Sequence, residues 1–288
     1  MISKIPAYPL DAQLSLLLRP TLHPLFQRLP DGISEYTFAN LYLFRDTHQY
    51  RVSRLADELL FLSGSDEGQS FFMLPFGLPE PNILKQLFAR FGSLKCISEN
   101  QAGLLTDSGY DVNEDRDNFD YLYLRRDLSE LTGKKFHKKR NLIRSFTKNY
   151  SYEGRPLLEE YIKDALLILE KWLASRQDPG DYPAAREALE RAEELQLCGG
   201  IYYVNNEPVA YSLGEELSCG TSFAIHFEKA VAEYKGLWQF INQAFASILP
   251  DCYETINREQ DLGAPGLRTA KLSYKPTGFV KKFRAVAP

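Results

Sequence analysis

The sequence predicts an α+β protein, with mixed α/β sheets, built from two copies of one domain. Two observations carry this prediction. The order of strand-like and helix-like segments in the first half is repeated in the second half. One junction also repeats in its residues, because residues 97–101 read ISENQ and residues 256–260 read INREQ. We therefore expect two tandem domains, each a mixed sheet flanked by helices.

The first half opens with helical segments and continues as strands and helices. Prolines break the leucine-rich residues 11–29 into a pair of short helices. Ser34–Thr47 is predicted as one helix with Ser34 as its cap. The helix at 81–91 has the clearest helical period of apolar residues. Strands are expected at residues 50–54, 59–62, 71–74, 94–98, 110–113 and 119–124, with a short helix at 100–107.

The second half begins with two long helices, at 157–175 and 183–195, which the first half lacks. Strands at 201–204, 209–217, 221–227 and 252–256 follow, with a helix at 236–249 before the last of them. A short helix at 267–274 and a strand at 279–286 complete the copy. We place the boundary after residue 128. Domain 1–128 is then a shorter, non-catalytic copy, and domain 129–288 carries the functional site.

Composition excludes several classes of protein. With 44% apolar and 25% charged residues, the 288-residue chain is typical of globular proteins. A net charge of −4 excludes general attraction to nucleic acid, so any such role needs a local basic patch. No apolar run is long enough to cross a bilayer, and the four cysteines lack metal-binding spacing. We expect a cytoplasmic protein without a metal or a tightly bound cofactor, in which His137 and His226 are ordinary surface or core residues.

Five consecutive polar residues, Asn257–Asp261, form what we call the polar segment, at the end of a predicted buried strand. Desolvating so many polar groups is unfavourable unless they bind a ligand or one another. A functional site satisfies that requirement, and so does an internal salt-bridge network that fixes the turn. The functional interpretation is favoured, because five successive polar groups exceed what a turn needs.

The polar segment and the helix after it supply the groups that general acid–base chemistry requires. A carboxylate, Glu259 or Asp261, is a candidate base, and Tyr274 is a candidate proton donor. Helical spacing places Arg268, Lys271 and Tyr274 on adjacent turns of one face. The predicted catalytic residues are Glu259, Asp261, Lys271 and Tyr274, and the predicted substrate-binding residues of this region are Asn257, Arg258 and Arg268.

The turn before the helix at 236–249 is a candidate phosphate site. A helix N-terminus offers unpaired N–H groups and the positive end of a dipole, and Gly236 allows a close approach to the backbone. An ordinary strand-to-helix turn that begins with glycine explains the same residues, and this simpler interpretation is favoured by the sequence.

A basic segment, Thr132–Lys148, lies between the copies. It carries seven cations, has no acidic residue, and keeps an apolar stripe of helical period. It is suited to the phosphates of a nucleotide, a tRNA acceptor stem or an anionic lipid head. A solvated helix face is the equally weighted alternative. Its cations are Lys134, Lys135, Lys138, Lys139, Arg140, Arg144 and Lys148.

Four short motifs carry a resemblance to a known family. They are the run 134–141 (KKFHKKRN), Tyr234-Lys235-Gly236, the run 257–263 (NREQDLG), and Gly266-Leu267-Arg268 followed by Lys271, Tyr274 and Pro276. The element order resembles the GNAT-type N-acyltransferase fold. Two tandem copies with these motifs resemble the Fem and phosphatidylglycerol lysyltransferase C-terminal group, within which the closest similarity is to the DUF2156 family.

The resemblance implies an acyltransferase or aminoacyltransferase. Its acyl group would pass from a carrier, acyl-CoA or aminoacyl-tRNA, to an amine or hydroxyl without a covalent enzyme intermediate. The resemblance adds Lys135, Lys138, Lys139, Arg140, Tyr234, Lys235 and Gly236 as carrier-binding residues.

The chain departs from the acyl-CoA pattern at the glycine turn. Glu233 and Trp238 flank Gly236, where a carboxylate repels a pyrophosphate and an indole crowds the helix start. This departure favours a tRNA-borne aminoacyl group, or no carrier at all, and the basic segment suits tRNA. The expected partner is a small-molecule or tRNA-borne acyl donor. The alternative is a non-catalytic binder of RNA or an anionic metabolite through residues 134–148, with peripheral membrane contact through the same helix as a weaker possibility.

Overall fold

The computed structural model describes residues 4–55 and 59–287. The chain forms two compact units, each discontinuous in sequence. Unit 1 contains Met1–Asp120, Gln260–Pro265 and Phe279–Pro288, and unit 2 contains Tyr121–Glu259 and Gly266–Gly278. The sequence led us to expect one boundary after residue 128, whereas the polar segment and the C-terminal residues here divide between the two units.

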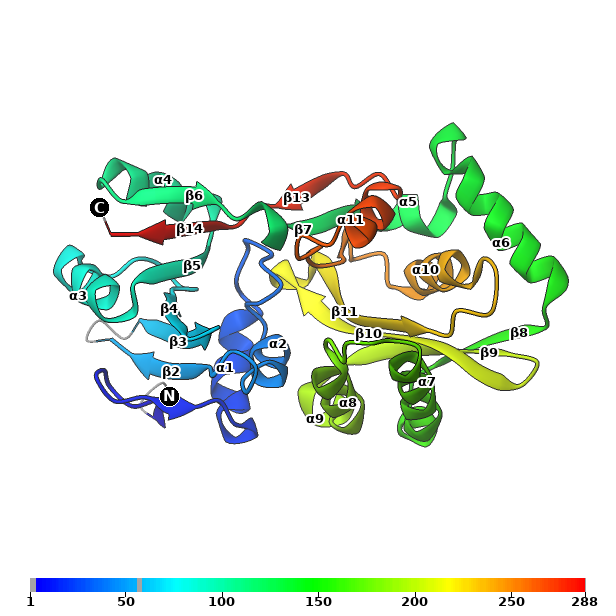
Figure 1. Ribbon diagram of the computed structural model, residues 1–288, viewed down its shortest axis with the longest axis horizontal. Coiled ribbons are helices and arrows are strands. Elements are labelled where there is room, and N and C mark those ends of the chain that lie inside the picture. Colours follow the sequence, from blue (N-terminus) through cyan, green and yellow to red (C-terminus); the bar gives the residue numbers. More distant parts are fainter. Residues whose placement is uncertain (1–3, 56–58, 288) are drawn as a thin grey trace. The chain divides into compact units, whose positions relative to one another are not determined.

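Unit 1 is built on a seven-stranded mixed sheet with the order β1-β2-β3-β4-β5-β14-β6 (Figure 1). Only β4 and β5 are parallel neighbours, and the other neighbours are antiparallel. In chain order the strands are β1 (Ala12–Gln13), β2 (Arg51–Arg54), β3 (Leu60–Asp66), β4 (Gln69–Met73), β5 (Ser93–Ile97), β6 (Asp111–Glu114) and β14 (Phe283–Val286).

Helices α3 (Pro81–Phe91) and α4 (Glu99–Asp107) bury their apolar side chains in the core of unit 1. The sequence-based bounds of α3 are confirmed, since proline begins the helix and Gly92 at φ 77° ends it. Helices α1 (Arg19–Phe26) and α2 (Phe38–Leu43) precede β2. The prediction of one helix over Ser34–Thr47 was wrong: α2 is shorter, and Thr37 is its cap. The Ser34 hydroxyl instead donates to Asp120.

Unit 2 has a second seven-stranded sheet, with the order β13-β7-β12-β11-β10-β9-β8 (Figure 1). Strands β11 and β12 are parallel, and the strands from β11 to β8 form antiparallel neighbours. The strands are β7 (Asp120–Leu124), β8 (Tyr152–Pro156), β9 (Cys198–Val204), β10 (Glu207–Leu217), β11 (Ser222–Ala230), β12 (Thr255–Asn257) and β13 (Gly278–Val280).

Helix α10 covers one face of this sheet, and α7 and α8 cover the other (Figure 1). The basic segment forms a 3₁₀ turn and helix α6, and the predicted helix at 157–175 begins only at residue 162 because another 3₁₀ turn precedes it. Strand β8 was not predicted. The helices of unit 2 are α5 (Arg125–Glu130), α6 (His137–Asn149), α7 (Ile162–Ala174), α8 (Tyr182–Glu190), α9 (Ala192–Leu195), α10 (Leu237–Ile248) and α11 (Pro265–Leu272).

The two sheets share one strand order, position by position, and each contains a strand from the other half of the chain. Strand β14 lies between β5 and β6, and β7 lies between β12 and β13. The sequence predicted a single C-terminal strand at 279–286, which was wrong: β13 and β14 are separate and belong to different sheets. Pairing partners are long-range choices, which strand propensity does not encode.

Candidate active site

The site in unit 2 begins where β11 and β12 stop pairing. The two parallel strands are paired only over Ser222–Ala224 and Thr255–Asn257, while β11 continues to Ala230. Beyond Ala224 the backbone of β11 no longer pairs with β12. Side chains of β11 and of the polar segment therefore meet one another there, instead of the two backbones.

A β-bulge at His226 directs its side chain into this region. Leu213 pairs with Phe227 and Gly214 pairs with Ile225, so His226 is the extra residue of β11. Gly214 permits the bulge because a Cβ there would lie 1.9 Å from the carbonyl oxygen of Ala224. Local sequence patterns do not report such a bulge, and the expectation that His226 is an ordinary residue did not anticipate its role.

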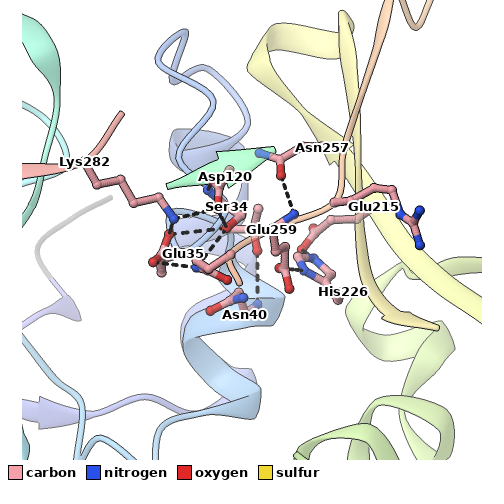
Figure 2. Close-up of polar contacts among 12 residues, drawn as sticks. Ser34, Glu35, Asn40, Asp120, Glu215, His226, Asn257, Glu259 and Lys282 are labelled. Carbon is pink, nitrogen blue, oxygen red and sulfur yellow. Dashed lines mark hydrogen bonds and ion pairs between the residues drawn. The ribbon is translucent and has the colours of Figure 1, made fainter. Parts of the chain in front are cut away.

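His226 is held between two carboxylates (Figure 2). Its Nε2 lies 3.0 Å from Glu215 Oε1 and its Nδ1 lies 2.7 Å from Glu259 Oε1. Burial opposes charge on the ring, but the two carboxylates outweigh it and raise the pKa of His226 to about 10. The imidazole is therefore charged at neutral pH and donates from both nitrogens. In that state it positions Glu259 and is unsuited to act as a base.

A second ion pair spans the same separation. Arg258, in the polar segment, donates to Glu228 Oε1 on β11 at 2.7 Å. The guanidinium carbon lies 5.5 Å from the centre of the Tyr274 ring, and Lys139 Nζ lies 3.8 Å from the same ring. One buried tyrosine thus contacts two cations, an arrangement that cation–π attraction favours.

Tyr274 and Lys139 have shifted pKa values that suit them to different proton-transfer roles. Burial raises the pKa of Tyr274 to about 12, so the phenol keeps its proton at neutral pH. Burial, followed by the nearby charge of Arg258, lowers the pKa of Lys139 to about 8. Lys139 also donates to the Ser273 hydroxyl at 2.7 Å. Lys139 is therefore the amine of this site that can lose a proton near neutral pH, which matches the requirement for a general base.

Lys271 and Asn257 hold the backbone of the polar segment. Lys271 Nζ donates to the carbonyl oxygens of Arg258 and Glu259, at 2.6 and 3.0 Å. Asn257 Oδ1 accepts from the Glu259 N–H at 2.8 Å, and Glu259 has φ 53°. The alternative of an internal network that fixes the turn is thus present in unit 2. It also brings the Glu259 carboxylate to His226.

Asp261 belongs to unit 1 and is fully buried there. Its Oδ1 accepts from the Gly263 N–H at 2.9 Å, and Arg116 donates to its Oδ2 at 3.4 Å. These contacts stabilise the turn, and its assignment as a base stays a prediction. Of the four predicted catalytic residues, unit 2 brings together Glu259, Lys271 and Tyr274.

Unit 1 also holds a buried charge network of its own. The fully buried Lys282 donates to Asp120 at 2.7 Å and to Glu35. Ser34 and Gln260 complete the network through bonds to Asp120 and Glu35 (Figure 2). Although burial opposes its charge, the two carboxylates raise the pKa of Lys282. A charged lysine is therefore part of the packing of unit 1.

The glycine turn is filled by a neighbouring helix. A Cβ at Gly236 would lie 2.4 Å from the Leu142 carbonyl oxygen of α6, and Gly236 has φ 91°. These two constraints require glycine without any ligand. Tyr234 packs edge-on against the Tyr150 ring at 5.1 Å, and Lys235 is exposed. Carrier binding by Tyr234, Lys235 and Gly236 stays a prediction.

The basic segment divides into paired and unpaired cations. Lys135 binds Asp127 at 2.6 Å, and Arg140 donates to the carbonyl oxygens of Leu131 and Gly133. Within residues 4–55 and 59–287, no acidic side chain pairs with the remaining exposed cations, which are Lys134, Lys138, Arg144 and Lys148. Arg268 is half-buried on α11.

The sequence missed the partners that make the site. Glu215, His226 and Glu228 lie on two strands. The contacts of Glu228 and His226 to the polar segment join residues 30 and 33 positions apart, and Glu215 binds His226. Charged residues at inward positions of predicted buried strands were the available signal. Among the described residues, no group of three or more His, Cys, Asp or Glu side chains is arranged to hold a metal ion. In the same residues, no helix is long and apolar enough to cross a membrane.

Two tandem mixed sheets with one strand order define the fold as a pair of GNAT-like domains. The fold matches FemX with a TM-score of 0.58 at 9% identity, covering 96% of this chain and 97% of FemX. It also matches a tandem GNAT protein of the clavulanic acid biosynthesis pathway with a TM-score of 0.54 at 9% identity, covering 97% of this chain and 98% of that one. The predicted fold class is confirmed.

Residues 26–286 match the family model described as phosphatidylglycerol lysyltransferase, C-terminal, and the chain belongs to this family. A conserved protein of unknown function from Bacteroides thetaiotaomicron is 30% identical, with a TM-score of 0.88 over 96% of this chain and 99% of that one. A domain assigned as the C-terminal domain (DUF2156) of a lysylphosphatidylglycerol synthetase from Agrobacterium fabrum is 12% identical, with a TM-score of 0.67 over 94% and 92% of the two chains. The family expected from the sequence is confirmed.

A curated relative matches only part of the chain. An uncharacterised protein of Mycoplasmoides gallisepticum is 27% identical over 191 residues, which are 61% of this chain and 59% of the relative. The match therefore spans less than two thirds of that relative's length.

Proposed function

We propose that the chain is a transferase that moves an acyl or aminoacyl group from a carrier to an amine or hydroxyl by direct attack. The observation that carries the proposal is the separation of β11 from β12, across which Glu228 and His226 bind the polar segment. Membership of the phosphatidylglycerol lysyltransferase C-terminal family supports this choice of chemistry.

In the proposed reaction the acceptor attacks the acyl carbonyl carbon, and the bond from that carbon to the carrier oxygen breaks. Lys139, with a pKa of about 8, takes the proton that the acceptor releases. Tyr274, whose pKa of about 12 keeps the phenol protonated at neutral pH, gives its proton to the leaving oxygen, so that the carrier departs as its hydroxyl, and the proton taken up by Lys139 restores the phenol through solvent. Arg258 supplies positive charge beside the developing oxyanion. His226 and Lys271 act as positioning residues for the polar segment.

Aminoacyl-tRNA is the proposed donor. The unpaired cations of the basic segment provide a surface for phosphates, which is the chief source of affinity for nucleic acid. Glu233 and Trp238 beside the glycine turn disfavour the pyrophosphate of acyl-CoA, and both are exposed.

Radiolabelled aminoacyl-tRNA and acyl-CoA, each offered with amine and hydroxyl acceptors, test this proposal. We expect transfer from aminoacyl-tRNA at a rate that rises with pH through about 8, and Lys139→Met should remove the rise. Lys171→Met, which changes an exposed lysine of α7, is the matched control and should retain it. Transfer from neither donor would overturn the proposal.

A second function, non-catalytic RNA binding, is favoured by one observation, the four exposed unpaired cations of the basic segment. Reversing Lys138, Arg144 and Lys148 to Glu should weaken tRNA binding and reduce the slope of log K against log salt by about 2 to 3. Reversing Lys163 and Lys171, exposed on α7, should leave the slope unchanged. Binding with this pattern but without transfer would select the binder over the enzyme.

A further inference from the structure

Unit 2 contains a cluster of buried polar atoms that bind nothing within the described residues. Five such atoms belong to four side chains: Tyr202 Oη, Ser212 Oγ, Glu228 Oε2, and the amide nitrogen and oxygen of Asn242. Ser212 is 0% exposed, Asn242 3% and Tyr202 4%. The Glu228 side chain is 8% exposed. We call these four residues the polar cluster.

The strand register places three of the four residues side by side. Ser212 of β10 pairs with Gly200 of β9 on one side and with Glu228 of β11 on the other. Directly paired residues of antiparallel strands project from the same face. The Tyr202 hydroxyl lies over this row, because it is 3.2 Å from the position of a Cβ on Gly200. The charge of Glu228 also contributes to the raised pKa of Tyr202.

Helix α10 places the fourth residue over the same row. Phe245 of α10 lies 3.5 Å from the Cβ position of Gly200, so α10 covers this face. At the other end, Gln239 of α10 acts on the Tyr274 side chain, where it counters the rise in pKa that burial causes. Asn242 is three residues from each of them and therefore shares their face of the helix. Its amide lies between the Tyr274 end and the Gly200 end of the row.

Five unpaired polar atoms in one buried place require an occupant. Each buried polar group without a partner costs about 1–3 kcal/mol, and native proteins satisfy nearly all of them. Four of the five atoms are oxygens. Two of these, Glu228 Oε2 and the Asn242 amide oxygen, can only accept hydrogen bonds. The missing partner must therefore supply at least two hydrogen-bond donors, one for each of these acceptors.

We propose that the polar cluster binds an amino group, as the amine or its ammonium form, of a molecule held in the site. This inference rests on the proposed function and deepens it, because it names the substrate class. Glu228 connects the cluster to the site: its Oε1 binds Arg258, and its Oε2 is buried without a hydrogen-bond partner among the described residues. Arg258 balances the carboxylate charge, so the cluster accepts an amine in either protonation state.

The amino group has two possible sources, the transferred aminoacyl residue and the acceptor. Matched probes distinguish them. Norvalinamide and pentanamide differ only in the α-amino group of an aminoacyl residue, and ethanolamine and ethylene glycol differ only in an acceptor-like amine. Saturation-transfer NMR on the full chain should show about tenfold tighter binding of the amine within at least one pair, the discrimination expected for hydrogen bonds to a carboxylate. Equal binding within both pairs would overturn the proposal.

Two variants locate the binding. Tyr202→Phe removes one hydroxyl of the cluster and should weaken binding of the selected amine about fivefold. Ser212→Ala gives a second test that does not depend on the tyrosine. Tyr211→Phe is the matched control, because its hydroxyl is also buried and unpaired but projects from β10 toward the other face of the sheet. Equal effects of the two tyrosine variants would contradict the assignment.

Failure of the amine-binding proposal can be distinguished from failure of the proposed transferase function. Selective amine binding without any transfer would retain the polar cluster as an amine site and reject the transferase. If transfer occurs, is unaffected by Tyr202→Phe and Ser212→Ala, and the protein shows no amine selectivity, the transferase is retained and the polar cluster is rejected as an amine site.

Discussion

The parallel junctions of the two sheets are built from different kinds of side chain. In unit 1, β4 pairs with β5 through Phe71 and Phe72, and the junction is packed into an apolar core. Gln101 closes it with a neutral hydrogen bond to the Leu74 carbonyl oxygen at 2.8 Å. In unit 2, the Arg258–Glu228 and His226–Glu259 ion pairs connect β11 to the polar segment at the corresponding junction.

Under the proposed function, the difference separates a structural junction from a catalytic one. Apolar packing and a capping box, formed by Ser98 and Gln101, stabilise the junction of unit 1, where the charged Lys95 of β5 lies over the Phe71 ring and pairs with Asp66. Buried ion pairs contribute little net stability compared with apolar packing, and the proposed function gives the pairs at this junction of unit 2 a chemical role. Four predictions test this comparison.

Glu228→Gln should have the largest effect. It leaves the Arg258 guanidinium buried without its carboxylate, which should lower the free energy of unfolding by about 3 kcal/mol. The transfer rate should fall at least about 100-fold, as when a preorganised charged group is removed. Urea denaturation and single-turnover assays measure the two effects. Glu99→Gln, which changes an exposed carboxylate beside the junction of unit 1, is the control, and an equal loss of rate there would refute the comparison.

Leu94→Ala should weaken unit 1 without slowing the reaction. The side chain is 1% exposed within the core, so its truncation should lower the free energy of unfolding by about 3 kcal/mol. The transfer rate, measured well below the melting temperature, should stay within about twofold of wild type, because the residue contacts only packing. A rate loss as large as that of Glu228→Gln would show that both junctions serve the chemistry.

His226→Gln should destabilise the protein in a pH-dependent manner. Burial disfavours the charge, but the carboxylates raise the folded-state pKa from 6.5 to about 10, so the stabilisation is complete below pH 6.5 and lost as pH rises through 10. The difference in free energy of unfolding from wild type should be about 2 kcal/mol at neutral pH. Denaturation curves between pH 6 and 10 measure it. A difference independent of pH would mean that the histidine is neutral.

Gln101→Ala should have the smallest effect. It removes one neutral hydrogen bond and half of a capping box, at about 1 kcal/mol. Thermal denaturation should show a slightly lower melting temperature, and the transfer rate should not change. A measurable loss of transfer would assign a functional role to the junction of unit 1.

Local patterns predicted the elements well and their long-range partners poorly. Helix α3 was located to the residue, because proline, the apolar period and Gly92 are all local signals. Ser34 looked like a cap for the same local reason, but its hydroxyl bonds Asp120, 86 residues away. The polar segment was recognised from composition alone. Its partners His226 and Glu228 were not, because a bulge and a strand register bring them there.

The position of β14 in the sheet of unit 1 determines when that sheet can be completed during translation. Strand β14 is an interior strand of unit 1, flanked by β5 and β6, yet Phe283–Val286 are synthesised after all of unit 2. While the ribosome translates the second half, β5 and β6 lack their shared neighbour and expose unpaired backbone edges. Unit 1 therefore completes its sheet after translation of the whole of unit 2, and a nascent chain that ends before residue 283 leaves the facing edges of β5 and β6 unpaired.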